Sequence, residues 1–354
     1  MADADQVDIG ASVRTVAAGI PLTRDEAAAV MASITSGRVS DIQIAGLLAA
    51  LRTRGETTDE VVGFAEAMRA CCVKVHLPEL QRPIIDTCGT GGDGHGTFNV
   101  STTAALVVAG AGVHVAKHGN RAQSSQTGSA DLLQALGATV STAPEDVAEQ
   151  VAHVGFGFML APEYHPAMRF VMPVRRGLGT PTVFNILGPL LNPAGVLRQV
   201  IGVRDRATAR LMATALAHLG SERVLMVTSS EGTDELTLAG LNHVVDLNGA
   251  TGDIAEYTVD AADLGFPHVP LDAIQGGDAR TNADITRSIL DGTAGPHRDT
   301  VLLNAGAALV AAGLAATIGE GAEMAGAAID SGAARNVLDR YVEVSGGVKI
   351  GHTT

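Results

Sequence analysis

The chain has almost no aromatic residues and very few cysteines. Its 354 residues include no Trp, 3 Tyr and 7 Phe, although 46% of all residues are hydrophobic. A core of Ala, Val, Leu and Ile suits helices packed closely on a buried sheet. Three cysteines, two of them adjacent at Cys71 and Cys72, provide neither a disulfide framework nor the spacing of a metal site. This composition favours a reducing, cytoplasmic compartment.

Basic charge and membrane segments are also scarce. The chain carries 24 Lys and Arg against 38 Asp and Glu, a net charge of -14, which argues against nucleic acid or an anionic membrane as partner. Residues 1–5 are acidic and lack the basic start and apolar core of a signal peptide. The one apolar run of near-membrane length, residues 301–319, contains Asn304 and Thr317. We therefore expect a buried helix there.

Carboxylates are missing from one window, residues 94–130, which contains Lys117 and Arg121. It overlaps a glycine loop, defined as residues 89–96, in which five glycines allow positive φ angles and close approach to a ligand. Asn99, Ser101 and Thr102 follow where a helix should begin, and a helix N-terminus attracts anions. A locally positive pocket in an acidic protein predicts a phosphorylated small molecule as ligand.

The first eighty residues contain the same helix pattern three times. Each copy has a capping box followed by apolar residues at i, i+3, i+4 and i+7. Gly37 and Gly55 are placed to end the first two helices. A small helical domain is predicted over residues 1–82, with its boundary near Pro78 to Pro83. The capping pairs are Thr23 with Glu26, Ser40 with Gln43 and Thr57 with Glu60.

Beyond residue 83, short apolar strands alternate with helices. This alternation predicts an α/β domain over residues 83–354, with a mostly parallel central sheet flanked by helices. We expect strands at 84–85, 113–116, 156–160, 199–203 and 223–227, and edge strands at 244–247 and 254–259. Helices are expected at 101–109, 129–136 and 206–219, and after a Thr142–Glu145 capping pair. Three last helices are expected at 284–290, 300–316 and 322–341.

Ligands of such sheets bind at the carboxyl ends of the strands. The glycine loop, Lys117, the segment after Leu160 and residues 229–235 all lie at such ends and should converge on one cleft. The pattern Gly89-x-Gly91-x-x-Gly94 matches a dinucleotide fingerprint, but the next strand ends in Lys117 instead of the acidic residue that a ribose requires. A purely structural glycine turn would leave the second hydroxyl-rich loop, residues 124–129, unexplained.

Eight motifs follow one another along the chain. They are Gly-Thr-Gly-Gly-Asp at 89–93, Asn-Val-Ser-Thr at 99–102, Lys-His-Gly-Asn-Arg at 117–121, Gly-Ser-Ala-Asp at 128–131, Ala-Pro-Glu-Tyr-His-Pro-Ala-Met at 161–168, Pro-Val-Arg-Arg at 173–176, Phe-Asn-Ile-Leu-Gly-Pro-Leu-Leu-Asn-Pro at 184–193 and Gly-Thr-Asp-Glu at 232–235. Taken together, these motifs resemble the anthranilate phosphoribosyltransferase family over nearly the whole chain. Several motifs in the right order are far more specific than any one of them.

The resemblance implies a reaction of tryptophan biosynthesis. The amine of anthranilate attacks C1 of 5-phosphoribosyl 1-diphosphate (PRPP), giving N-(5-phosphoribosyl)anthranilate and pyrophosphate. It also implies Mg2+ as cofactor and a cytoplasmic homodimer. The implied fold is nucleoside phosphorylase-like, with a segment near 176–194 that crosses back to the N-terminal helices.

The resemblance further implies the residues of the site. Arg175 and Arg176 are adjacent; Arg175 is expected at the anthranilate carboxylate and Arg176 in a structural ion pair. Anthranilate is expected to contact Gly89, Asn120 and Arg175, and magnesium Ser101, Asp234 and Glu235. PRPP is expected to contact Gly89, Gly92, Asp93, Thr97, Asn99, Val100, Ser101, Thr102, Lys117, His118, Gly119, Asn120, Arg121, Ala122, Gln123, Ser124, Ser125 and Ser129.

The residue types suit this chemistry. Loss of pyrophosphate leaves a positively charged sugar, so catalysis should depend on stabilising the departing charge and positioning the amine. Lys117 can stabilise that charge. An aryl amine is already unprotonated at pH 7 and needs no strong base, so His118 either accepts its proton or only shapes the amine's pocket. For the adjacent Asp234 and Glu235, a plain structural role is the alternative to metal binding.

Two rival functions remain open at this point. A pyrimidine nucleoside phosphorylase of the same fold would not account for the Asp234-Glu235 pair or for the Arg175 segment. A non-catalytic nucleic-acid-binding paralogue would be expected to show basic clusters, which this chain lacks. Residues 241–243 match no family motif and receive no role.

Overall fold

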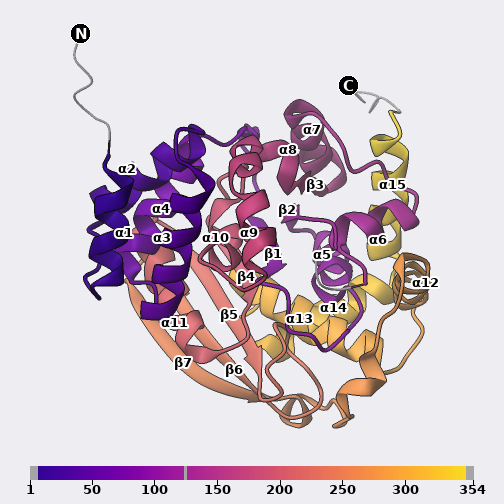
Figure 1. The fold of residues 1–354 in the computed structure, drawn as a ribbon. Coiled ribbons are helices and arrows are strands. Elements are labelled where there is room, and N and C mark those ends of the chain that lie inside the picture. The colour runs from indigo at the N-terminus through magenta and orange to yellow at the C-terminus, as the bar shows by residue number, and fades with distance from the viewer. Residues whose placement is uncertain (1–6, 123–125, 348–354) are drawn as a thin grey trace.

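The computed structural model describes residues 7–122 and 126–347. Four helices form a bundle at one side of the molecule (Figure 1). They are α1 (Ile9–Ala17), α2 (Arg24–Thr35), α3 (Asp41–Arg54) and α4 (Thr58–Ala70). All three predicted capping boxes are present, and Gly55 ends α3 with a φ of 89°. Helix α1 was not predicted, because its cap Asp8 is followed by Ala11 at the position where a capping box has Glu or Gln.

The larger part of the chain is built around a seven-stranded sheet, in which the strand order is β3-β2-β1-β4-β5-β6-β7. Strands β1 to β5 are parallel, and β6 and β7 extend the sheet antiparallel. The predicted mostly parallel sheet is confirmed, and both strands expected at its edge are present; only β7 is an edge strand, because β6 pairs with both β5 and β7. The bounds are β1 (Ile84–Gly89), β2 (His114–Gly119), β3 (Phe156–Leu160), β4 (Arg198–Gly202), β5 (Arg223–Ser229), β6 (Leu241–Asn248) and β7 (Asp253–Asp260).

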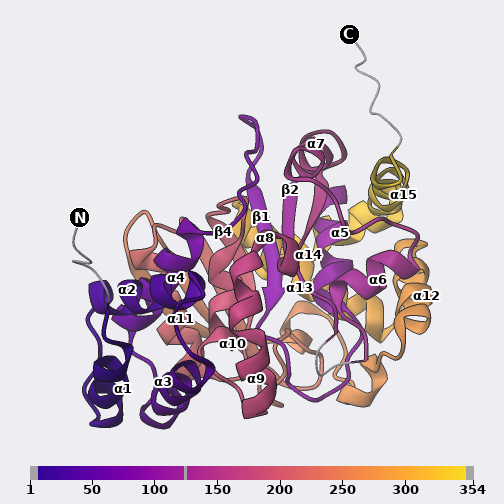
Figure 2. The same cartoon turned by 45° about the horizontal axis from the view of Figure 1, so that its top comes forward.

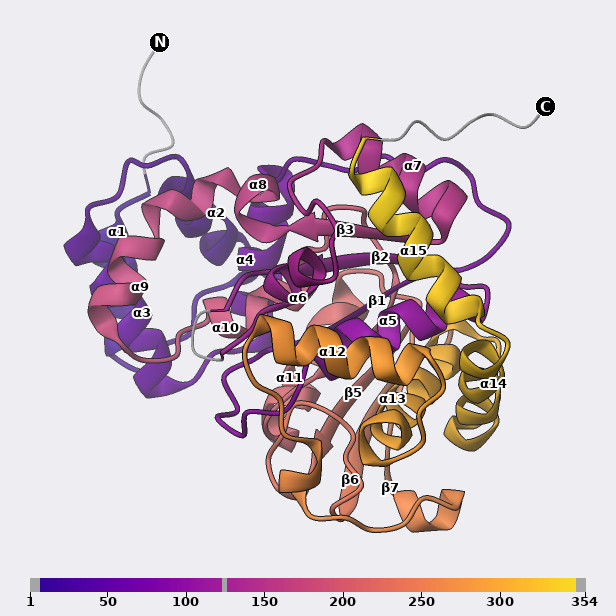
Figure 3. The ribbon, with the colours of Figure 1, turned by 90° about the vertical axis from the view of Figure 1, so that its right-hand side faces the viewer.

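Helices cover both faces of the sheet, as expected. Helices α5 and α13 pack on one face, in a core that contains Val115 and Leu225; α11 packs on the other, with Ile201 and Met226. Figure 3 shows α12 to α15 on the side away from the N-terminal bundle. These helices are α5 (Val100–Gly110), α6 (Ser129–Ala135), α7 (Pro144–Val154), α8 (Ala161–Tyr164), α9 (Met172–Leu178), α10 (Phe184–Leu187), α11 (Arg206–His218), α12 (Ala279–Leu290), α13 (Pro296–Ala312), α14 (Ile318–Asp330) and α15 (Ala333–Ser345).

The segment after β3 runs back to the N-terminal bundle. It contains α8, α9, α10 and two short 3-10 helices, η1 (Pro166–Phe170) and η2 (Gly188–Leu191). Val174, Phe184 and Leu190 lie in the same apolar core as Leu51 of α3 and Phe64 of α4. Figure 2 shows α9 and α10 between the bundle and the strands. The segment thus connects the helical bundle to the carboxyl ends of the strands.

Three predictions about helices were wrong. Residues 322–341 are not one helix, because Gly332 adopts a left-handed φ of 76° between α14 and α15. The apolar run 301–319 is likewise interrupted, because α13 ends before Gly313, with a φ of 79°. Thr142 does not cap α7: Ala143 is the N-cap, and the Thr142 hydroxyl is buried without a partner. Over residues 7–122 and 126–347, no helix has the length and hydropathy to span a bilayer.

Candidate active site

A cavity of about 520 Å³ lies at the carboxyl ends of β1, β2 and β3. Residues 88–92 include the end of β1 and the turn after it, residues 118–121 include the end of β2 and the turn after it, and residues 161–168 follow β3; all three segments contribute to its lining. Its other wall comes from α9, α10 and η2, with Arg175, Phe184 and Leu187. Three of the predicted segments therefore meet at one cleft, since the ends of parallel strands share one edge of the sheet. Lys117 and residues 229–235 do not line this cavity, although Asp234 contacts Gly91 of the glycine loop.

The glycine loop uses the backbone freedom that its composition predicts. Gly91, Gly92, Gly94 and Gly96 all have positive φ, between 68° and 82°. The Gly91 N–H donates to Asp234 Oδ2 at 2.7 Å, and Arg204 Nη1 donates to the Gly92 carbonyl at 2.9 Å. Contacts on both sides therefore hold the loop over the end of β1.

The N-terminus of α5 brings several predicted residues together. The Ser101 N–H donates to Glu235 Oε1 at 3.3 Å, and the Thr102 hydroxyl donates to Ser129 Oγ at 3.0 Å. Asn99 donates to the Thr127 carbonyl at 3.0 Å. Thr97 forms an isolated β-bridge with Gln275, and the Val100 side chain is fully buried, so Val100 can offer a ligand only its backbone.

Lys117 lies beneath the cleft and is only 1% exposed. Its ammonium donates to the Thr87 carbonyl and lies 3.5 Å from Ser101 Oγ. Burial lowers the pKa of Lys117, while the nearby carboxylates of Asp86 and Glu235 act to raise it. The lining of the cavity includes Arg121, Arg169 and Arg175 and no carboxylate of the described residues, as the predicted positive pocket requires, whereas the buried Lys117 ammonium faces carboxylates from other segments.

Asp86 is a buried carboxylate near Lys117 to which the sequence assigned no role. It is fully buried and accepts from the His118 N–H at 3.2 Å and from Asn192 Nδ2 at 2.8 Å. Burial raises the pKa of Asp86 to about 6, against the opposing effect of Lys117. The position of Asp86 just before the glycine loop was the available signal.

Three carboxylates interact next to the glycine loop: Asp93, which belongs to the loop, and Asp234 and Glu235. Burial, then repulsion from Asp93, raises the pKa of Asp234 to about 6. Burial and the charge of Asp234 raise the pKa of Glu235 well above its usual value. Asp93 Oδ1 accepts from the His95 N–H, while its buried Oδ2 has no partner. In the described part of the chain, no three His, Cys, Asp or Glu side chains form a ready metal site.

The apolar end of the cavity contains a charged group without a counter-ion. Arg175 of α9 is half-buried and forms no ion pair with any described residue; burial lowers the pKa of its guanidinium. It lies 5.7 Å from the centre of the Phe184 ring and 3.5 Å from Asn185 Oδ1. A flat apolar ligand with a carboxylate would fit here. The ion pair expected for Arg176 is not found among the described residues. The Arg176 side chain is exposed instead.

Two histidines meet in the same cavity. The rings of His118 and His165 are 5.0 Å apart, edge to face. His118 Nε2 and both ring nitrogens of His165 are buried without a hydrogen-bond partner. Burial lowers the pKa of His118 to about 3 and that of His165 to about 4, so both are neutral at pH 7. His165 was not assigned a role from the sequence, although it lies in the motif at 161–168.

The loop after β2 is held by Asp131 of α6. Asp131 accepts from the N–H groups of Ala122 at 2.8 Å and Gly128 at 3.0 Å, and it pairs with Arg121 at 3.0 Å. Gly119 and Asn120 line the cavity. The predicted residues Gln123, Ser124 and Ser125 lie outside the described residues.

Comparisons with known proteins cover most of the chain. Residues 12–72 match the helical bundle domain, and residues 81–335 the a/b domain, of a glycosyl transferase family. The anthranilate phosphoribosyltransferase of Rubrobacter xylanophilus is 48% identical over 335 residues, covering 94% of this chain and 96% of that protein.

Solved structures show the same likeness. The anthranilate phosphoribosyltransferase from Thermus thermophilus matches with a TM-score of 0.88 at 44% identity, over 95% of this chain and 99% of that one. The Saccharomyces cerevisiae enzyme in complex with PRPP and Mg matches with a TM-score of 0.87 at 27% identity, over 96% and 98%. A further structure of the yeast enzyme contains 4-fluoroanthranilate.

Proposed function

This chain belongs to the anthranilate phosphoribosyltransferase family, and from that premise we propose the following reaction for its cleft. The amine of anthranilate displaces pyrophosphate from C1 of PRPP and forms N-(5-phosphoribosyl)anthranilate, a step of tryptophan biosynthesis. Support comes above all from Arg175: a cation with no counter-ion among the described residues lines the same cavity as Gly89 to Gly92 of the glycine loop.

PRPP binds, in this proposal, between the glycine loop and the N-terminus of α5. The glycine loop offers backbone N–H groups to the diphosphate, and Asn99, Ser101, Thr102 and Ser129 offer side-chain donors. Lys117 acts from below, because its ammonium lies near Ser101 Oγ and is fixed by the Thr87 carbonyl. The remaining contacts proposed for PRPP are Gly89, Gly92, Asp93, Thr97, Val100, His118, Gly119, Asn120, Arg121, Ala122, Gln123, Ser124 and Ser125.

Magnesium is the proposed cofactor, held by Asp234, Glu235 and Ser101. The residues fit a hard cation: they supply oxygen atoms, the two carboxylates repel each other, and Asp93 Oδ2 nearby is buried without a partner. Bound Mg2+ would neutralise charge on the leaving pyrophosphate. Because the described residues contain no complete metal site, the diphosphate and water would supply most ligands.

Anthranilate is proposed to bind with its carboxylate at Arg175 and its amine toward the sugar. Arginine can form two parallel hydrogen bonds to a carboxylate, which lysine cannot. Gly89 and Asn120 line the same cavity as Arg175. With a pKa of about 3, His118 is a poor general base, so we assign it the second role: its unpartnered Nε2 can accept a hydrogen bond from the amine.

The assembly is proposed to be a cytoplasmic homodimer. The proposed domains are residues 1–82 and 83–354, joined by the crossover at 176–194. Ile42 of α3 is 84% exposed, which suits a subunit contact on the helical domain.

Product analysis separates this function from its rivals. Incubation with anthranilate, PRPP and Mg2+ should yield phosphoribosylanthranilate by mass spectrometry, while uridine or thymidine with phosphate should remain unchanged. Cleavage of the nucleoside would favour a phosphorylase. If both mixtures stayed unchanged while the folded protein retained DNA, the binding paralogue would be favoured.

A further inference from the structure

The segment that carries Asp234 and Glu235 has no regular secondary structure. This acidic loop, residues 230–240, connects β5 to β6. It lies so close to the sheet that a Cβ on Gly202 would be 1.6 Å from the Asp234 carbonyl. Two adjacent carboxylates repel each other, and an irregular loop could relieve that repulsion by turning one of them away. Contacts from outside the loop must therefore fix the backbone.

Two buried asparagines supply those contacts directly after the carboxylates. Asn304 of α13 accepts from the Leu236 N–H at 3.0 Å and donates to the Leu236 carbonyl at 2.8 Å. Asn242 of β6 does the same for Thr237, at 2.8 and 2.9 Å. Both side chains are at most 3% exposed. A side-chain amide has a donor and an acceptor side by side, so each asparagine satisfies both backbone groups of one residue.

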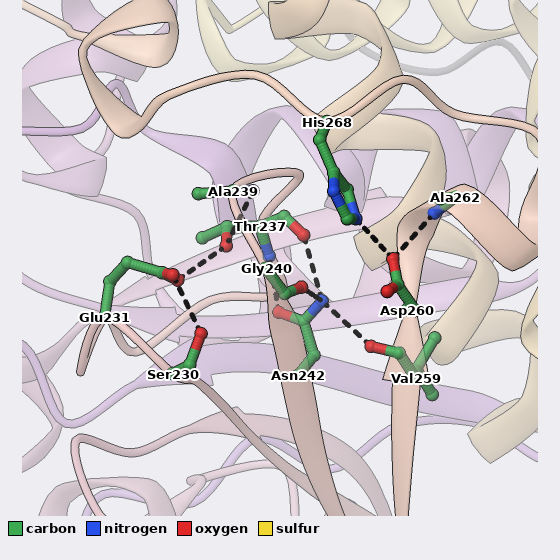
Figure 4. A network of polar contacts seen from close by, with 10 residues as sticks. All are labelled: Ser230, Glu231, Thr237, Ala239, Gly240, Asn242, Val259, Asp260, Ala262 and His268. Carbon is green, nitrogen blue, oxygen red and sulfur yellow. Dashed lines mark hydrogen bonds and ion pairs between the residues drawn. The ribbon is translucent and has the colours of Figure 1, made fainter.

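Other polar side chains hold the rest of the acidic loop. Figure 4 shows Glu231 accepting from Ser230 at 2.8 Å and from Thr237 at 3.2 Å, while Asn242 also reaches the carbonyls of Gly240 and Val259. Upstream, the Thr233 hydroxyl donates to the Glu235 carbonyl at 3.0 Å. The loop is thus held from both ends. The N–H groups of Gly91 and Ser101 bind the two carboxylates themselves, whereas Asn242 and Asn304 bind the backbone that follows them.

We propose that Asn242 and Asn304 are positioning residues for the divalent cation. By binding two consecutive backbone units after Glu235, they hold Asp234 and Glu235 together in the cleft before the cation arrives. The inference rests on the proposed function, and it gives a role to Asn242, which the sequence left without one. Neither asparagine needs to touch substrate, cation or the reacting atoms.

The test measures cation binding rather than turnover. Mn2+ binding, in the presence of saturating PRPP and without anthranilate, is followed by electron paramagnetic resonance in the parent, Asn242→Ala and Asn304→Ala. Loss of a residue that orients metal ligands should weaken Mn2+ affinity by about 10- to 100-fold. Asn304→Asp keeps the acceptor for the Leu236 N–H but loses the donor, so its affinity should fall between those of the parent and Asn304→Ala.

Two further variants separate positioning from general stability. Ser345→Ala removes another buried side-chain bond, to the Thr139 N–H at 3.0 Å, and should lower the melting temperature without changing Mn2+ affinity. In an Asp234→Asn, Glu235→Gln background, Asn304→Ala should cause no additional loss of Mn2+ affinity.

The outcomes are distinct. Weak Mn2+ binding in both single variants, with no further loss in the combined one, supports the inference. Parent-like affinity in folded Asn242→Ala and Asn304→Ala overturns it and leaves the metal site standing. Parent-like affinity in Asp234→Asn, Glu235→Gln overturns the proposed metal site and the inference with it.

Discussion

At the scale of single residues, Arg175 distinguishes the acceptor from the donor. Arg175→Ala should weaken anthranilate binding about ten- to a hundredfold, because a charge-assisted hydrogen bond contributes roughly 1.5–3 kcal/mol. PRPP affinity should be nearly unchanged. Separate calorimetric titrations of the two ligands measure this. Arg176→Ala is the matched control, since its exposed side chain forms no ion pair in the described structure. Equal losses for both ligands would mean that Arg175 supports the cleft as a whole.

Lys117 and Asp86 make a second prediction, which depends on pH. Because the pKa of Asp86 is higher in the folded protein than in the unfolded chain, Asp86 favours folding at low pH. This contribution is lost as the pH rises from the pKa of Asp86 in the unfolded chain through about 6, its pKa in the folded protein. Lys117→Met removes the charge that opposes the shift, so the pKa of Asp86 should rise further.

The stability of Lys117→Met relative to the parent should therefore be lower at pH 8 than at pH 5, and PRPP affinity should fall. Urea unfolding of both proteins at the two pH values measures the first effect, and calorimetry the second. If the difference in stability between the two proteins does not change with pH, the charge of Lys117 does not affect the pKa of Asp86. Unaltered PRPP affinity would remove Lys117 from the donor site.

At the scale of elements, the three capping boxes look alike in sequence but differ in burial. Glu26 and Gln43 are exposed, whereas Glu60 is fully buried, accepts from the Leu22 N–H at 2.9 Å and pairs with Arg54. Glu60→Ala should therefore destabilise the protein by about 3–5 kcal/mol, as breaking a buried ion pair does.

The sister variants provide the matched control. Glu26→Ala and Gln43→Ala should each cost about 1 kcal/mol, as loss of an exposed cap does. Denaturant titration of the three variants tests the difference. Similar losses in all three would show that the buried contacts of Glu60 add nothing to the cap.

Local patterns predicted elements well and contacts poorly. Capping boxes and strand periodicity identified α2 to α4 and β1 to β7, because these signals act within a few residues. The break at Gly332 was missed, since the apolar period continues across it. The contacts of Asp86, Asn242 and Asn304 could not be predicted, because each joins segments that only the folded chain brings together.

At the scale of the whole molecule, the proposed homodimer gives a further prediction. Sedimentation should yield twice the 36.0 kDa of one chain. Ile42→Glu places a charge on an 84% exposed apolar residue of α3 and should shift the equilibrium toward monomer. Leu241→Glu is the control, because Leu241 is also exposed but is the first residue of β6 and belongs to no helix of the bundle. Equal mass for the parent and Ile42→Glu would exclude this part of α3 from the interface.

The resemblance in the motifs predicted the family and the fold class correctly, because those motifs follow one another along the strand ends. Charge was harder to predict. The window at 94–130 lacks carboxylates in the sequence, yet Asp86 and Glu235 approach Lys117 from other segments. A local count of charges therefore could not predict the surroundings of Lys117, although the cavity lining does contain arginines and no described carboxylate, while the order of the motifs identified the reaction.

The central claim is that this cleft transfers a phosphoribosyl group to anthranilate with the help of Asp234 and Glu235. Loss of anthranilate fluorescence, followed while PRPP and Mg2+ are added singly and together, tests it most directly. We expect fluorescence to fall only when both are present, and the Asp234→Asn, Glu235→Gln variant to need more Mg2+ and to react more slowly. Constant fluorescence with folded parent protein would contradict the claim. A magnesium activation curve of the variant that overlays the parent's would contradict the role of the two carboxylates.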